Sequence, residues 1–100
     1  MNISNELAVA LIGLKDLIIN DYQRKMGADR EYGVDFDDGS KYVKVTVMSW
    51  SSRSVHCFVE KANGNIWRAA SWKSPARNFV RGNIYDQASY ADRVSWTGVQ

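Results

Sequence analysis

Apolar side chains recur at helical spacing over residues 4–26. One stripe, at about 100° per residue, contains Leu7, Leu11, Leu14, Ile18 and Tyr22. Ser4 is a suitable N-cap for this helix, and Gly27 is suited to end it. Neighbouring apolar residues, Ile12 among them, widen the stripe beyond what one sheet face would cover. Two interpretations stay open: the helix lies deep in the groove of a curved sheet, or its excess apolar surface meets a second copy of the chain.

From residue 31 the hydrophobic period changes to two, which predicts an antiparallel meander over residues 31–73. The first two strands carry their inward-facing apolar sets at Tyr32, Val34, Phe36, Val43, Val45 and Val47. Asp38-Gly39 predicts a two-residue turn, which pairs Val34 with Val43 and Tyr32 with Val45. In that register both strands direct their apolar sets to the same side, as a hairpin requires.

A third strand continues the inward-facing set with Val55, Cys57 and Val59. Asn63-Gly64 is a second turn signal and leads to a fourth strand. A two-residue turn there sets Trp67 opposite Glu60, whereas a three-residue turn with a bulge sets it opposite Val59. We favour the second register because it keeps Trp67 inside and turns Arg68 out.

The last quarter, residues 74–100, reads as short helices and a final strand. Pro75 suits the first position of a helical turn over residues 75–80. Asp86 is a candidate cap for a short helix over 87–92, and residues 94–97 are suited to a strand. The chain is therefore expected to form a single domain, residues 1–100, of the α+β class. An N-terminal amphipathic helix packs on a four- to five-stranded antiparallel meander, which is either open or curled into a small open barrel.

Composition narrows the classes of protein that fit. The 100 residues are 45% hydrophobic and 24% charged, an ordinary globular mixture, and the net charge is +2. Residues 1–50 carry six Lys and Arg against eight Asp and Glu, whereas residues 51–100 carry seven against three. This asymmetry fits either a basic face on the second half or a dipole without functional consequence.

The chain contains one cysteine, Cys57, which excludes an intramolecular disulfide and a cysteine-based zinc site. A single thiol fits a reducing compartment, so we expect a cytoplasmic protein. The longest apolar run, residues 7–14, is too short to span a bilayer, so we expect no membrane association.

Catalytic chemistry is poorly supported. The only histidine, His56, adjoins Cys57, and neighbouring side chains of a strand point to opposite faces, so the two cannot form a dyad. Cys57 is expected in the core and His56 on the outside beside Phe58. Asp35, Asp37 and Asp38 are best explained by a hairpin turn rather than by a cation site. We therefore expect no enzyme activity, no cofactor and no metal.

The stretch Ile66–Asn83 combines basic residues with aromatic ones and contains no acid. Basic groups attract phosphates, and aromatic rings stack on unpaired bases. Together with Arg53 from the Ser-rich loop at residues 49–53 and His56 from the third strand, it nominates a binding surface of Arg53, His56, Arg68, Trp72, Lys73, Arg77 and Arg81. Single-stranded nucleic acid, a protein contact and simple packing are three open explanations for this composition.

Two segments, Ser54–Arg77 with "SVHCFVEKANGNIWRAASWKSPAR" and Val80–Asp86 with "VRGNIYD", resemble small uncharacterised proteins of bacteriophages, marine phages especially. The resemblance covers about a third of the chain, and Asn78-Phe79 departs from the shorter link that the pattern has. It implies a viral protein acting in a bacterial cytoplasm and implies no activity. Our first functional hypothesis is a homodimeric, non-enzymatic protein-interaction module, such as a phage accessory protein. The alternative is a single-stranded nucleic-acid binder that uses residues 66–81.

Overall fold

The predicted amphipathic helix is α1, Asn5–Met26, in the computed structural model of the chain, which describes residues 4–27, 32–49 and 51–100. Ser4 Oγ accepts the backbone N–H of Leu7 at 3.1 Å, and Gly27 ends the helix with a φ of 97°. All five residues of the predicted stripe are buried. Within the described residues, no helix is long and apolar enough to cross a membrane.

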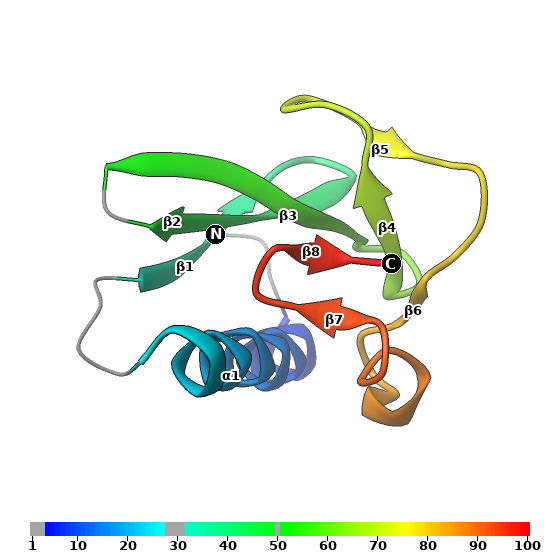
Figure 1. The fold of residues 1–100 in the computed structure, drawn as a ribbon. Coiled ribbons are helices and arrows are strands. Elements are labelled where there is room, and N and C mark those ends of the chain that lie inside the picture. The colour runs from blue at the N-terminus through cyan, green and yellow to red at the C-terminus, as the bar shows by residue number, and fades with distance from the viewer. Residues whose placement is uncertain (1–3, 28–31, 50) are drawn as a thin grey trace.

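The main sheet is antiparallel and open. Its strands are β1 Tyr32–Asp38, β2 Tyr42–Ser49, β3 Ser52–Glu60, β4 Asn65–Ala69, β5 Pro75–Ala76 and β6 Gly82–Asn83. The order is β1-β2-β3-β4-β5, and β6 also pairs with β4. Figure 1 shows the sheet above α1, with β1 and the β5–β6 segment at opposite ends. The expected α+β class and antiparallel meander are confirmed, and the sheet does not close into a barrel.

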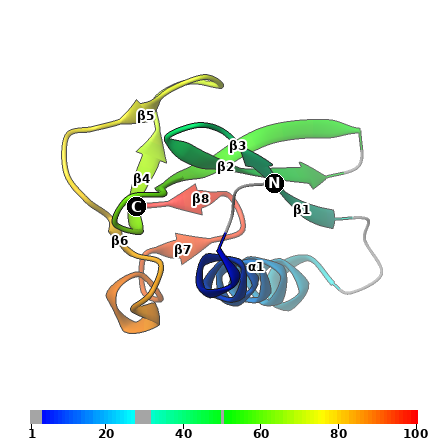
Figure 2. The same cartoon turned by 180° about the vertical axis from the view of Figure 1, so that it is seen from behind.

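A second small sheet completes the layer beneath the main one. It consists of β7, Val94–Ser95, and β8, Gly98–Val99, and follows the short 3-10 helix η1, Gln87–Ser89. In both cartoon views α1 and the β7–β8 sheet lie on the same side of the main sheet (Figures 1 and 2). We call this side of the main sheet the inner face and the opposite side the outer face. The core lies between the layers and contains Leu14, Val45, Cys57, Val59 and Ile66.

The first hairpin has a different register from the predicted one. Val34 pairs with Val47, and Asp38 pairs with Val43. The N–H of Gly39 donates to the carbonyl of Tyr42 at 2.9 Å, so the turn lies at residues 40–41 rather than 38–39. A Cβ on Gly39 would come within 2.8 Å of that carbonyl, which explains the glycine without a turn at its position. Because the shift is even, both apolar sets still face the same side.

The second hairpin contradicts both registers considered for Trp67, which pairs with Phe58. The connection spans residues 61–64, with Gly64 at a φ of 82° and its N–H bonded to the carbonyl of Glu60. Ile66 therefore joins the core on the inner face. Trp67 is buried on the outer face, where its indole N–H donates to Glu60 Oε1 at 3.0 Å.

The last quarter of the chain is more extended than predicted. Pro75 and Ala76 form β5 against β4 instead of starting a helical turn. The cap residue Asp86 precedes only the 3-10 turn η1 and makes no side-chain cap hydrogen bond. The strand predicted over 94–97 is present only as β7, because residues 96–97 form the turn that leads to β8.

A substitution in the buried stripe of α1 should lower the free energy of unfolding far more than one on its exposed side. Leu14 is fully buried, so Leu14→Ala should lower the free energy of unfolding by about 2–5 kcal/mol. Val9 is 70% exposed, so Val9→Ala should change it by less than about 0.5 kcal/mol. Urea unfolding followed by circular dichroism measures both. A loss at Val9 that equals the loss at Leu14 would contradict the exposed position of Val9.

Candidate functional site

The structure divides the seven residues of the nominated binding surface between the two faces of the main sheet. Arg53, Trp72, Lys73 and Arg77 gather on or over the outer face. His56 and Arg68 lie on the inner side, where both line a hollow against the β7–β8 sheet. Arg81 is buried outside both hollows. The seven residues therefore do not form one surface, but four of them lie together on the outer face.

A β-bulge in β3 determines which of His56 and Arg53 lies on the outer face. Val45 pairs with Cys57, but the next residue of β2, Thr46, pairs with Val55, so His56 is the extra residue. Beyond the bulge the alternation is reversed, and Arg53 lies opposite Met48 on the outer face. The predictions that His56 faces outward and Val55 inward are wrong for this reason. Arg53 also belongs to β3 rather than to a loop.

Trp72 lies over the outer face with two cations on its ring. Lys44 Nζ is 4.6 Å from the ring centroid, and the guanidinium carbon of Arg53 is 5.9 Å away. The indole remains 45% exposed. The segment between β4 and β5 carries Trp72 back over β2 and β3, and it is seen in Figure 1 arching above the sheet. Ser71 and Ser74 hold this arch together through an Oγ–Oγ hydrogen bond of 3.0 Å.

A second group of cation and ring contacts adjoins Trp72. The guanidinium of Arg77 lies 4.3 Å from the ring of Trp67 and 5.8 Å from that of Tyr42, whose hydroxyl it also hydrogen-bonds. Glu60 Oε1 is 3.6 Å from the same guanidinium and accepts the indole N–H of Trp67. Arg77 is thus held in place by its neighbours, and Glu60 has an ion-pair partner, Arg77, and a hydrogen-bond donor, Trp67, on the outer face.

A hollow of about 300 Å³ opens beside these rings. Its lining combines three lysines with two aromatic rings and one carboxylate: Lys41, Lys44, Lys73, Tyr42, Phe58 and Asp37, with Gly39 and Ser40 at the turn. We call this hollow, together with Arg53, Trp72 and Arg77, the outer-face surface. It carries five cations; Asp37 is the carboxylate of the hollow's lining, and Glu60 contacts Arg77.

The sequence analysis missed Lys41, Tyr42 and Lys44. The signal that identifies the last two is the alternation of the second strand, in which Tyr42 and Lys44 take the positions between the inward-facing valines. All three lie outside the basic stretch at residues 66–83 on which the nominated surface rests. Trp50, close to Arg53 in the sequence, lies outside the described residues.

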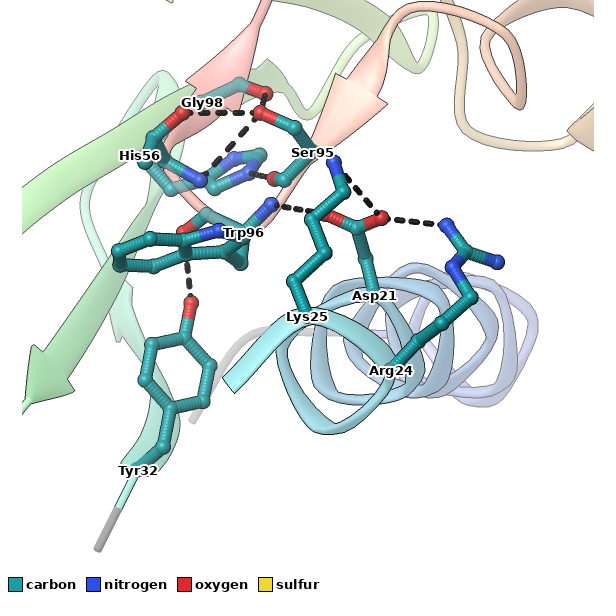
Figure 3. Close-up of polar contacts among 9 residues, drawn as sticks. Asp21, Arg24, Lys25, Tyr32, His56, Ser95, Trp96 and Gly98 are labelled. Atoms are coloured by element: carbon teal, nitrogen blue, oxygen red, sulfur yellow. Dashed lines mark hydrogen bonds and ion pairs between the residues drawn. The ribbon is translucent and has the colours of Figure 1, made fainter. Parts of the chain in front are cut away.

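His56 instead closes the inner side. It is 2% exposed, and its Nε2–H donates to the carbonyl of Ser95 at 2.7 Å. Asp21 Oδ2 accepts the N–H of Trp96 at 2.9 Å, and the hydroxyl of Tyr32 donates to the Trp96 carbonyl at 2.7 Å. Figure 3 shows these bonds converging on the β7–β8 turn from β3, α1 and β1. We call these three bonds the turn clasp.

Asp21 is buried, and its carboxylate forms ion pairs with two cations of the same helix. Burial on its own would raise the pKa of its carboxyl group, but the Trp96 N–H and the nearby Lys25 and Arg24 outweigh burial and lower that pKa. Arg24 and Lys25 lie 2.5 and 3.3 Å from Oδ1 (Figure 3). The carboxylate therefore serves the packing of the small sheet.

Arg81 is buried to 5% exposure and lies 3.7 Å over the ring of Phe79. Its Nη2 donates to Asn78 Oδ1 at 3.3 Å. Burial first, and then the like charges of Arg68 and Arg93, lower the pKa of its guanidinium. Because the side chain is covered, Arg81 does not offer the basic contact that was nominated.

The remaining reactive groups are packed away. Cys57 is fully buried, as expected, and burial raises the pKa of its thiol. In the part of the chain that the structure describes, no cluster of three or more His, Cys, Asp or Glu residues could hold a metal ion. The outer-face surface is therefore the site whose chemistry remains to be explained.

Comparison with known proteins gives one result that covers nearly the whole chain. The sequence model of a family described as "Family of unknown function (DUF7717)" matches residues 4–100. No curated protein and no solved structure matches the chain. The matched range includes α1 and every strand described above.

The stability of the fold should depend on the protonation of His56. Burial lowers the pKa of His56 by more than the hydrogen bond to the Ser95 carbonyl raises it. A second proton would bind at Nδ1, which has no hydrogen-bond partner among the described residues. The folded state therefore binds fewer protons than the unfolded chain below about pH 6.5. This contribution to stability is complete above that pH and is lost as the pH falls towards the lower, folded pKa.

Urea unfolding at about pH 7.5, 6.5 and 5.5 measures this effect, because carboxylates of ordinary pKa stay ionised over that range. His56 is the only histidine, so His56→Gln should flatten the profile, and its amide still offers an N–H to Ser95. Parallel profiles for the two proteins would contradict a buried, neutral His56.

Proposed function

The chain belongs to the family of unknown function DUF7717, and we propose that it is a non-enzymatic module that binds single-stranded nucleic acid on its outer-face surface. The supporting observation is the exposed Trp72, whose ring has Lys44 and Arg53 beside it. An aromatic ring beside cations supplies the two interactions that a single strand offers, which are base stacking and phosphate attraction.

The exposed part of Trp72 is the stacking platform. Its ring is 45% exposed although two cations accompany it, so a base has room to cover the indole. Base–aromatic stacking contributes roughly 1–3 kcal/mol and tolerates any base, since every base has a π face. Stacking of this kind needs an unpaired base, and this requirement favours a single strand over a duplex.

The adjoining hollow supplies the path for the backbone. Lys41, Lys44 and Lys73 line it, and ammonium groups bind phosphate as mobile point charges. Arg77 is tied to Tyr42, Trp67 and Glu60, so it adds charge from a fixed position. The single carboxylate of the lining, Asp37, is the one group that repels a phosphate there.

Binding also fits the way the surface is built. The arch that carries Trp72 and Lys73 is exposed, and its position depends on the strands beneath it. Arg53 reaches the same place only because of the bulge at His56. Cations from three segments distant in sequence thus meet on one face, and this convergence supports a binding role over packing alone. The expected homodimer remains a prediction.

Anisotropy of a labelled oligothymidylate at two salt concentrations tests the proposal. The protein should bind it saturably at low salt and more weakly at high salt. Trp72→Ala should weaken binding by roughly 5- to 150-fold, which corresponds to a lost stack of 1–3 kcal/mol. Arg53→Ala and Lys44→Ala should each reduce the slope of log affinity against log salt by about 0.7.

Arg68→Ala is the matched control, because it removes an exposed arginine from the inner side of the same sheet. Its affinity and salt slope should equal those of the unaltered protein. A loss at Arg68 as large as that at Arg53 would move the site off the outer face. The absence of saturable binding at low salt would end the proposal.

A further inference from the structure

A groove between α1 and β1 lies at the far edge of the molecule from β5 and β6. Its volume is about 280 Å³, and it is lined mainly by the apolar side chains of Ala8, Leu11, Ile12, Val34 and Phe36, with Lys15 and Asp35 beside them. Ile12 is 54% exposed, and the exposed Val9 stands on the same helix. The helix therefore keeps part of its excess apolar surface at this groove, uncovered by the sheet.

The strand beside the groove has an open edge. β1 pairs with β2 along one side, and among the described residues no strand pairs with the other side of β1. The bond from Gly39 N–H to the Tyr42 carbonyl belongs to the same register as the hairpin. Hydrogen-bonded and non-bonded pairs alternate along an antiparallel ladder, so residues 33, 35 and 37 bond to β2. Val34 and Phe36 then direct their backbone N–H and C=O groups to the open edge.

The same two residues serve the groove and the edge. The side chains of Val34 and Phe36 line the groove, and their backbone groups are available to a further strand. In an added strand, every second side chain would face the groove and the others would face the side of Asp35 and Asp37. Both carboxylates are exposed, and neither is in an ion pair among the described residues, although Asp37 lies opposite Lys44 in the hairpin.

These features indicate which partner fits. Alternate apolar side chains match the groove, and alternate basic side chains match Asp35 and Asp37. A second copy of β1 fits poorly, because antiparallel self-pairing centred on Asp35 sets that carboxylate against its own copy. We propose that the β1 edge binds an extended segment of another protein as an added strand, in which apolar residues alternate with Lys or Arg. This interaction does not depend on the nucleic-acid proposal.

A labelled synthetic peptide of alternating Val and Lys is the probe, and a peptide of alternating Val and Glu is its control. Anisotropy should show saturable binding of the Val/Lys peptide and at least about tenfold weaker binding of the Val/Glu peptide. Amide exchange followed by NMR should slow at Val34 and Phe36, because their N–H groups become hydrogen-bonded. Asp35→Lys should reverse the order of the two peptides.

Asp92→Lys is the matched control variant, an equal charge change at an exposed residue close to η1, at the other end of the molecule (Figure 2). It should leave the preference unchanged. Equal binding of both peptides, no saturable binding of the Val/Lys peptide, or unchanged exchange at Val34 and Phe36 would overturn the proposal. Light scattering that shows a dimer broken by Asp35→Lys or Ile12→Glu would also overturn it, by assigning the face to a second copy.

Discussion

The β-bulge at His56 is the constraint on which both faces of the sheet depend. One extra residue in β3 reverses the alternation, so His56 turns to the inner side and Arg53 appears on the outer face. The hydrogen bond from His56 to the Ser95 carbonyl then joins β3 to the small C-terminal sheet. Asp21 and Tyr32 hold the adjacent Trp96 from α1 and β1. One local irregularity thus supplies the His56 bond of the turn clasp and the place of Arg53 on the outer-face surface.

Regular alternation made much of the fold predictable from the sequence. The stripe of α1, its caps and the strands of the meander follow from periods of 3.6 and two, and all are present. The positions of the turns were harder to predict, because contacts from elsewhere in the chain can override the turn preference of a dipeptide such as Asp38-Gly39. Lys61 Nζ contacts Asp38 Oδ1 at 2.6 Å and the Gly39 carbonyl at 3.0 Å, and the turn lies two residues later. Trp67 was assigned inward because large aromatic rings usually fill cores. It fills instead a layer on the outer face under Arg77.

Four of the seven nominated residues lie together on the outer face, and the path of the chain explains why. Trp72, Lys73 and Arg77 lie on the chain that folds back over β4, and Arg53 reaches them through the bulge. A bulge has no reliable single-residue signature, so the sequence could not show that Arg53, and not His56, lies on the outer face. The open edge of β1 was equally hidden, because the order of strands determines which strand lies outermost. The resulting molecule presents two unlike surfaces, one basic and aromatic, the other an apolar groove beside the open edge of β1, and Asp37 adjoins both.

The central claim is that the outer face is the functional one, and the four tryptophan indole N–H signals in an NMR spectrum test it most directly. Assignment uses single Trp→Phe variants, and the titrant is an unlabelled oligothymidylate at low salt. The account predicts a saturable shift of the Trp72 indole while the Trp96 indole, held at the turn clasp, stays in place. A saturable shift at Trp96 with none at Trp72 would contradict the account.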